Sequence, residues 1–398
     1  MKMMNAYMIT TRKIIEPFNE HPRRSLIMNQ ELGSLQKGAL ESCGLELKPV
    51  ASITEIDESK EHIIFVDSLY FTKELLNEFI ARSRVQNRRT TCAAKPGITT
   101  LRSVVSTQDV TICPDHIEYG LSYVPAKSPK DDPVPVVIDL DQFYEAFPMP
   151  EHMFGNKEYP IPMTDLLIAQ IDHWTNLWAV NIATLLSEAA KLKKASKLKL
   201  LRLALRAASF NQWRVISKLN RIGCNCDIHP TAYIEGSTIG NNVRVGARSV
   251  IRESIIGDKS YIGNNVTIDL SAIGEECNIR NGAVVQYAVL YPGTFTMNRL
   301  ISISLCGRNT FIGDGVVLSD FRLDREPVTV IRDGRQINTG NIFIGSCLGH
   351  GVYLGAGIVL APGRTIPNGI RIALDEARII RKCYPQEEIP GHRRVNGF

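Results

Sequence analysis

Several features that define other protein classes are missing from this chain. No apolar run reaches the about 18 residues of a membrane-spanning helix, and the first eleven residues contain no basic and apolar leader with a small-residue cleavage site. Its nine cysteines are scattered, and the sequence has no CxxC pair and no His/Cys cluster at zinc spacing. We therefore expect a cytoplasmic protein with reduced, mostly buried thiols.

Charge of one sign is also scarce. The net charge of +5 over 398 residues is too small to indicate general nucleic-acid binding. One exception lies between Ala189 and Cys226, where ten lysines and arginines occur without an acidic residue. Residues 191–214 combine these cations with leucines and aromatics at helical spacing. This segment is either a peripheral membrane contact or a helix packed between two domains with its lysines in water.

The C-terminal half contains an internal repeat of 17 residues. Three apolar columns recur at this step: Ile222, Ile239, Ile256, Ile273 and Leu290; Ile228, Val245, Ile262 and Ile279; and Ile234, Ile251, Ile268 and Val285. Each turn therefore has three inward side chains separated by corners, which describes a triangular coil. The repeat predicts a left-handed parallel β-helix, a solenoid of hexapeptide units whose core is the stack of inward residues.

The period is interrupted twice and then resumes. It breaks at residues 291–304 and again at 319–341, and from Ile342 to Ile372 it returns at a strict step of six. Segment 319–341 is polar, so we expect it to leave the prism as a loop, and such insertions commonly carry function. The β-helix is predicted for residues 222–372, followed by a C-terminal tail at 373–398. Self-association commonly covers the flat face of such a solenoid, so we expect a homotrimer with its sites between neighbours.

The N-terminal part has a different pattern. Residues 1–160 mix short apolar runs with helical stretches, which indicates an α/β domain, and a basic helical connector is predicted for residues 161–221. Residues 63–66 predict a buried strand, and an amphipathic helix follows at 71–81. Asp67 ends the strand, at the position where open sheets usually bind ligands. It is either a metal ligand or a strand-end cap, and we favour the cap.

Residues 293–369 resemble the C-terminal half of the bifunctional sugar-1-phosphate nucleotidylyltransferase/acetyltransferases, relatives of N-acetylglucosamine-1-phosphate uridyltransferase. The resemblance is carried by SDFRLD at 319–324, INTG at 337–340 and IGSCLGHGVYLG at 344–355. It implies that the loop and its neighbouring coils bind an acceptor sugar or sugar nucleotide together with acetyl-CoA or another acyl-CoA. The substrate candidates are Asp320, Arg322, Asp324, Asn338 and Thr339, and the coenzyme candidates are Arg364 and Gly355.

The general base of that family is missing from its expected place. The resemblance implies a histidine just after a Gly-Thr pair, but Gly293 and Thr294 are followed by no histidine as far as Cys306. His350, between two glycines beside the loop, is the best remaining candidate for a catalytic base. We expect its side chain to point outward, toward a subunit cleft. The alternative is a solvated corner histidine without a catalytic role.

The strand end at Asp67 also resembles the site where sugar nucleotidyltransferases hold their metal ion. The glycine-rich phosphate loop of that fold is absent from residues 7–13, which argues against strong nucleotide binding. Three hypotheses follow. The chain is an acyltransferase acting on a sugar or sugar nucleotide, a catalytically inactive trimer that binds a sugar nucleotide or acts as a scaffold, or a sugar-1-phosphate nucleotidyltransferase that uses Mg²⁺.

Overall fold

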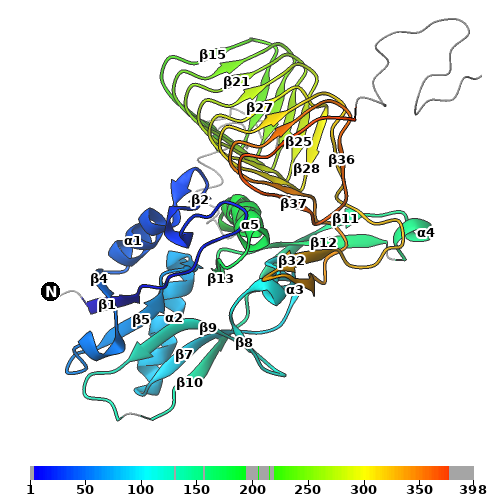
Figure 1. The fold of residues 1–398 in the computed structure, drawn as a ribbon. Coiled ribbons are helices and arrows are strands. Elements are labelled where there is room, and N and C mark those ends of the chain that lie inside the picture. Colours follow the sequence, from blue (N-terminus) through cyan, green and yellow to red (C-terminus); the bar gives the residue numbers. More distant parts are fainter. Residues whose placement is uncertain are drawn as a thin grey trace, which may run out of the picture.

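The computed structural model describes residues 4–129, 131–155, 157–193, 205, 215 and 219–375. An α/β domain and a triangular β-helix lie side by side, with a long helix between them (Figure 1). Of the basic segment predicted at 191–214, all but residues 191–193 and Leu205 lies outside the described residues. No helix in the described part of the chain combines the length and apolar character required to cross a membrane.

The α/β domain is built on a mixed sheet. Its strands lie in the order β10 (Val134–Ile138), β7 (Thr90–Ala94), β9 (Ile117–Val124), β5 (His62–Val66), β1 (Met4–Ile9) and β4 (Leu45–Val50), and β8 (Thr111–Ile112) pairs with β9. All pairings are parallel except those made by β8 and β9. The predicted strand at 63–66 lies within β5, and its alternate residues enter a core of Ala6, Phe65 and Leu121.

Short elements and helices complete this domain. They are η1 (Pro22–Arg24), β2 (Leu26–Ile27), β3 (Gln30–Glu31), α1 (Leu32–Ser42), η2 (Ile53–Glu55), β6 (Leu69–Phe71), α2 (Lys73–Gln86), α3 (Ile98–Arg102) and η3 (Val105–Thr107). The helix predicted at 71–81 is α2, which begins two residues later because the hydroxyl of Thr72 accepts a hydrogen bond from the backbone N–H of Leu75 (3.4 Å). Its apolar face, including Phe79, is buried.

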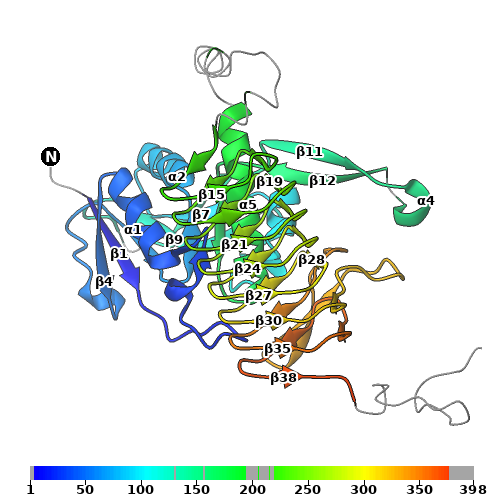
Figure 2. The same ribbon diagram turned by 90° about the horizontal axis from the view of Figure 1, so that it is seen from above.

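The C-terminal part is the predicted β-helix, with three parallel sheets (Figures 1 and 2). The first sheet contains β14 (Arg221–Ile222), β17 (Thr238–Ile239), β20 (Ile255–Ile256), β23 (Ala272–Ile273), β26 (Val289–Leu290), β29 (Leu305–Cys306), β34 (Cys347–Leu348) and β37 (Thr365–Ile366). The second contains β15 (Asp227–Ile228), β18 (Arg244–Val245), β21 (Tyr261–Ile262), β24 (Asn278–Ile279), β27 (Phe295–Thr296), β30 (Phe311–Ile312), β35 (Tyr353–Leu354) and β38 (Arg371–Ile372). The third contains β16 (Tyr233–Glu235), β19 (Val250–Arg252), β22 (Thr267–Asp269), β25 (Val284–Gln286) and β28 (Leu300–Ser302), and β31 (Val317–Leu318) pairs with β36 (Val359–Leu360) beyond it.

The three apolar columns form the core of this prism, as predicted. Ile262, Ile268 and Ile273 are each fully buried and belong to one hydrophobic cluster. The glycine after an inward residue is required by close approach of the next coil, because a Cβ on Gly223 would lie 2.5 Å from the carbonyl oxygen of Gly240. The close stacking of successive coils therefore leaves no room for a side chain at this corner.

The interruption expected at residues 291–304 is not a break in the coil. β27 and β28 continue their sheets there, and Thr296 fills the column position where other turns have isoleucine or valine. The turn is shorter by one residue, which shifts the sequence pattern without expelling a loop. Segment 319–341 does leave the prism, and it contains the hairpin of β32 (Thr329–Arg332) and β33 (Arg335–Asn338).

The helix between the domains is α5 (Trp174–Lys193). The helical connector predicted from residue 161 becomes helical only at Trp174. Before it lies β13 (Ile168–Gln170), which pairs with β6 in antiparallel orientation. Trp174 is 1% exposed and shares one hydrophobic cluster with outward residues of the first sheet, including Val289 and Leu305. One face of the prism is therefore covered by the chain's own α/β domain.

A hairpin arm projects from the α/β domain past the side of the β-helix, across the direction in which the coils follow one another (Figures 1 and 2). It consists of β11 (Phe143–Pro148) and β12 (Glu158–Met163), with α4 (Glu151–Phe154) at its tip. The ring of Phe154 lies 5.2 Å from that of Phe321 and 5.8 Å from that of Phe343, measured between centroids. These contacts join the arm to the ends of the 319–341 segment.

Candidate functional site

His350 lies at a coil corner, but its ring is packed against the α/β domain of its own chain. Its Nδ1 accepts a hydrogen bond from the backbone N–H of Arg308 (2.9 Å), and its Nε2 lies 3.1 Å from Oε1 of Glu20. The ring centroid is 4.9 Å from that of Phe18. The side chain thus does not have the expected outward direction toward a subunit cleft.

These contacts determine which nitrogen of the neutral His350 ring carries the proton. Because Nδ1 accepts a hydrogen bond, the proton of the neutral imidazole is on Nε2, which faces Glu20. Burial opposes the charge of Glu20, but the hydrogen bond with His350 and the nearby Arg308 outweigh it and lower the pKa of that carboxyl. The catalytic role of His350 stays a prediction.

The five substrate candidates do not converge on one point. Arg322 and Asp324 pair with each other, with Nε of Arg322 donating to Oδ1 of Asp324 (2.9 Å). Thr339 is buried, and its hydroxyl donates to the carbonyl of Val328 (2.7 Å). These side chains stabilise the loop itself.

The other two candidates differ from each other. Oδ1 of Asn338 accepts a hydrogen bond from the backbone N–H of Gly340 (2.8 Å), so this side chain also orders the loop. Asp320 instead lines a cavity of about 710 Å³ between the two domains. Among the five, Asp320 is the residue whose side chain the structure places at a cavity.

The loop docks on the α/β domain. Arg332 donates to the carbonyl of Thr107 (2.8 Å), and Nδ2 of Asn341 donates to the carbonyl of Leu101 (2.9 Å). His173, at the start of α5, has its Nε2 3.2 Å from the carbonyl oxygen of Ile331. Burial lowers the pKa of His173 to about 4, so the ring is neutral and Nε2 donates. The loop therefore joins the two domains.

The coenzyme candidates lie at two different corners of the last coils. The backbone N–H of Gly355, just after β35, donates to the carbonyl of Ile372 (2.8 Å). The carbonyl of Arg364, just before β37, accepts from the backbone N–H of Cys347 (2.9 Å). These bonds belong to the coil ladder and leave the Arg364 side chain half-buried. Their role with an acyl-CoA stays a prediction.

Asp67 is fully buried at the end of β5, and both of its carboxylate oxygens contact the segment after β1. Oδ2 accepts from the backbone N–H of Thr11 (2.6 Å), and Oδ1 accepts from its hydroxyl (2.7 Å). Nε2 of His21 lies 3.2 Å from Oδ2. These contacts describe a cap that holds the chain leaving β1, and metal binding by Asp67 stays a prediction.

Beside this cap, a second cavity of about 650 Å³ opens at the carboxyl end of β1. Its lining is polar and basic, and consists of Thr10, Asn19, Glu20, His21, Arg23, Arg24, Glu31, Gly33, Ser34 and Lys37. Arg23 lies across α1, where the absence of a side chain at Gly33 makes room: a Cβ there would be 3.1 Å from the guanidinium. The Nε of Arg23 is buried and has no hydrogen-bond partner in the described part of the chain.

The cations of this basic cavity are not among the residues selected from the sequence. A glycine-rich loop at residues 7–13 would bind phosphate through backbone amides. The cations of this cavity instead come from the turn and the helix that follow in the chain. A signal was present in Pro22-Arg-Arg24, which opens η1 directly before α1. What could not be read from it is that the Arg23 guanidinium turns back over Gly33.

The structure also brings together Cys113, His116 and Glu118, whose possible ligand atoms lie within 4.8 Å of one another. No His/Cys cluster at zinc spacing was expected from the sequence. Nδ1 of His116 lies 2.8 Å from Asp115 and Nε2 lies 3.2 Å from Glu118, and these two hydrogen bonds raise the pKa of the ring. Pairing with carboxylates accounts for the positions of these side chains.

Comparison with known proteins agrees with the fold and with the resemblance found in the sequence. Residues 206–300 match the family model of the GMPPB C-terminal domain. The matched region contains the 17-residue coils, upstream of the loop that carries the sequence resemblance. The predicted similarity to hexapeptide-repeat proteins of the sugar-nucleotidyltransferase type is therefore confirmed for this part of the chain. No curated protein sequence matches.

Three solved structures are similar to part of the chain. A putative acetyltransferase from Bacillus cereus is 18% identical over 38% of this chain and 77% of its own, with a TM-score of 0.19. UDP-N-acetylglucosamine acyltransferase from Campylobacter jejuni is 14% identical over 38% of this chain and 66% of its own, with a TM-score of 0.21. The acetyltransferase domain of PglB from Neisseria gonorrhoeae, in complex with acetyl coenzyme A, is 18% identical over 37% and 50%, with a TM-score of 0.14. Likeness at these TM-scores carries no functional information.

Proposed function

We propose that this protein is a sugar-related transferase that binds a sugar nucleotide or sugar phosphate in the basic cavity at the carboxyl end of β1. The observation that carries the proposal is Arg23, which lines this cavity and whose buried Nε has no hydrogen-bond partner in the described residues. An unsatisfied buried donor costs about 1–3 kcal/mol, and an anionic oxygen of a ligand would remove that cost.

The position and charge of the cavity support the same ligand. Open sheets with parallel strands bind ligands beyond the carboxyl ends of those strands, where this cavity lies. Arg23, Arg24 and Lys37 supply three cations against the two carboxylates of Glu20 and Glu31. In this proposal, side-chain cations replace the backbone amides of a glycine-rich loop. An arginine fork suits the geometry of phosphate oxygens.

The test is calorimetric titration with UDP-N-acetylglucosamine, GDP-mannose and inorganic pyrophosphate. We expect saturable binding of at least one of them, weakened about tenfold or more by Arg23→Gln, because a hydrogen bond to a charged group contributes about 1.5–3 kcal/mol. Arg88→Gln is the matched control, since Arg88 is exposed in the same domain away from the cavity. Absence of binding by all three ligands, or equal affinity of the Arg23 variant, would contradict the proposal.

Acyl transfer from acetyl-CoA or another acyl-CoA is the second candidate function. It is favoured by the family-like sequence at 319–355, which includes His350 and Gly355. Titration of acetyl-CoA into the wild type, His350→Ala and Arg364→Ala tests it. Since His350 also contacts Glu20, Glu20→Gln separates the two roles. Binding lost in the His350 and Arg364 variants but kept in the Glu20 variant supports acyl transfer, and no binding by the wild type rejects it.

A homotrimer is the assembly that we propose. Of the three prism faces, the second sheet exposes a stack of aromatic side chains, with ring centroids of Phe295 and Phe311 5.5 Å apart and those of Phe311 and Tyr353 5.9 Å apart. Apolar surface of this kind is a common site of self-association. Light scattering of the purified protein would give the mass, and a monomer mass at micromolar concentration would refute the trimer.

A further inference from the structure

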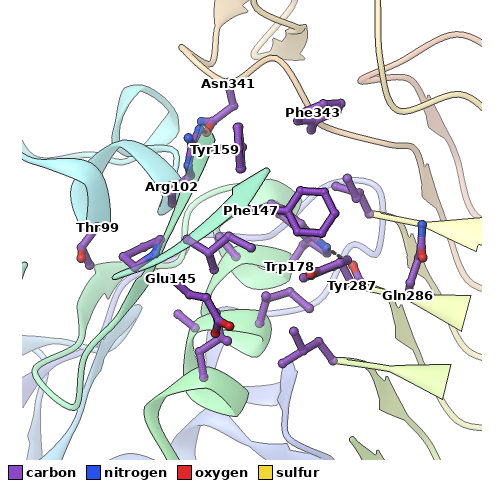
Figure 3. A pocket seen from close by; sticks show the side chains of 18 of the residues that line it. Thr99, Arg102, Glu145, Phe147, Tyr159, Trp178, Gln286, Tyr287, Asn341 and Phe343 are labelled. Atoms are coloured by element: carbon purple, nitrogen blue, oxygen red, sulfur yellow. Dashed lines mark hydrogen bonds between the residues drawn. The ribbon is translucent and has the colours of Figure 1, made fainter. Parts of the chain in front are cut away.

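The cavity between the domains is a separate structural feature with a mainly apolar lining (Figure 3). Its volume of about 710 Å³ lies within the range of small-molecule sites, about 300–1,000 Å³. The walls come from α3, the β11–β12 arm, α5, the third sheet of the β-helix and the 319–341 loop. Its aromatic lining residues are Phe147, Tyr159, Trp178, Tyr287 and Phe343.

One wall carries Arg102, a half-buried arginine that forms no ion pair with the described residues. Arg102 donates from one terminal nitrogen to Oδ1 of Asn341 (2.7 Å), and its guanidinium carbon lies 3.9 Å from the centroid of the Tyr159 ring. Its Nε is buried with no hydrogen-bond partner, and the described residues offer it no ion pair. The hydroxyl of Thr99, one turn earlier on α3, is also buried and has no hydrogen-bond partner in the described part of the chain. Two polar groups on the same wall therefore lack partners among the described residues.

The wall on the β-helix side has the opposite charge. Glu235, Glu253 and Asp269 come from the third sheet and its corners, and Glu145 comes from β11. Arg252 neutralises one of them, with its Nε 2.6 Å from Oδ1 of Asp269. Burial and the charges of Glu145 and Glu235 raise the pKa of Glu253. An anionic group entering the cavity is repelled from this wall and attracted to Arg102.

The side chains between these two walls are apolar. Figure 3 draws Phe147 and Trp178 between Arg102 on one side and Gln286 on the other. The indole N–H of Trp178 is already used, since it donates to the carbonyl of Tyr287 (2.7 Å). The middle of the cavity thus offers contact area and few free hydrogen-bonding groups, which suits a hydrocarbon body rather than a hydroxyl-rich one.

We propose that this cavity binds an amphipathic carboxylate of the fatty-acid class, with its carboxylate on Arg102 and its hydrocarbon chain among the aromatic side chains. A carboxylate at Arg102 would supply the counter-charge that the described residues do not. A sugar nucleotide fits this cavity less well, because its several charges and hydroxyls would face apolar and acidic walls. The site is independent of the basic cavity and of the function proposed above.

The experiment compares three ten-carbon probes by titration calorimetry with the full chain. Decanoate should bind saturably, while decan-1-ol and decylamine should bind at least about tenfold more weakly, as expected when a charge-assisted hydrogen bond is lost. Arg102→Gln should abolish this preference for decanoate. Arg335→Gln, an exposed arginine of β33 outside the cavity lining, is the matched control and should behave as wild type.

Two further variants keep the test decisive if Arg102→Gln affects folding. Ala183→Phe, on α5, fills part of the cavity and should weaken decanoate binding while Arg102 is intact. Arg23→Gln should leave decanoate binding unchanged, which separates this site from the basic cavity. Equal affinity for decanoate and decan-1-ol, no saturable binding of decanoate, or full binding by the Ala183 variant would overturn the proposal.

Discussion

The β-helix and the α/β domain obtain their cores in different ways. In the β-helix, partners in space lie a constant 17 residues apart over most of the coils, as Ile251 and Ile268 do. In the α/β domain, paired strand residues are separated by irregular intervals along the chain, as His62 and Val124 are. A regular spacing makes a fold readable from its sequence, whereas the basic cavity lies within the irregular domain and the apolar cavity lies where that domain meets the β-helix.

The largest effect that would test this contrast is expected from Trp174→Ala. Trp174 is 1% exposed and packs in the cluster that joins the α/β domain to the β-helix. Its removal should lower the free energy of unfolding by about 3–5 kcal/mol. Because both domains share the cluster, calorimetry should show the whole unfolding endotherm shifted. A shift confined to one of two separated transitions would mean that the junction does not couple the domains.

Ile268→Ala should destabilise the β-helix by a similar or smaller amount. Ile268 is fully buried in the coil stack, and deletion of such a side chain costs about 2–5 kcal/mol. Hydrogen exchange should show faster exchange in the coils on both sides of residue 268, with the α/β sheet less affected. Val317→Ala is the control, because Val317 is 47% exposed and should change stability little. Equal effects of the two substitutions would contradict the assigned core.

Lowering the pH should destabilise the contact between His173 and the 319–341 loop, because the ring becomes protonated. Burial lowers its pKa from the ordinary 6.5 to about 4, so folding favours the neutral ring. The resulting stability is complete above pH 6.5 and falls as the pH drops toward 4, by up to about 3 kcal/mol for a shift of this size. Urea unfolding at several pH values measures it. His173→Gln should remove most of the loss, and an unchanged pH dependence in that variant would assign the loss to another group.

Glu253→Gln should have the smallest effect, and with the opposite sign. Burial and neighbouring carboxylates raise the pKa of Glu253 in the folded state, so its charged form costs stability at neutral pH. The variant should therefore melt at a higher temperature than the wild type at pH 7. The difference should shrink as the pH falls through the folded pKa and vanish below the ordinary carboxyl range. A lower melting temperature at pH 7 would contradict the assigned environment.

The predictions are confirmed where neighbours in space follow from local spacing along the chain. The three apolar columns predicted the β-helix, and the predicted strand and helix around Asp67 lie where they were expected. The predictions are wrong where pairing between distant segments determines the secondary structure. Residues 162–173 are apolar enough for a helix but include β13, because β6 offers a partner strand. The coil also continues through residues 291–304, where an interruption was expected, because Thr296 fills an inward position.

By itself, the sequence determined the repeat, its three columns and the position of the loop, because each coil packs on the next at a fixed separation along the chain. Only the tertiary structure decided which polar groups lack partners. Nε2 of His350 lies 3.1 Å from the carboxylate of Glu20, and Arg102 donates to Asn341 while its Nε has no hydrogen-bond partner among the described residues. These groups come from segments that are far apart in the chain and meet only after both domains have folded, so spacing along the sequence carries no record of their contacts.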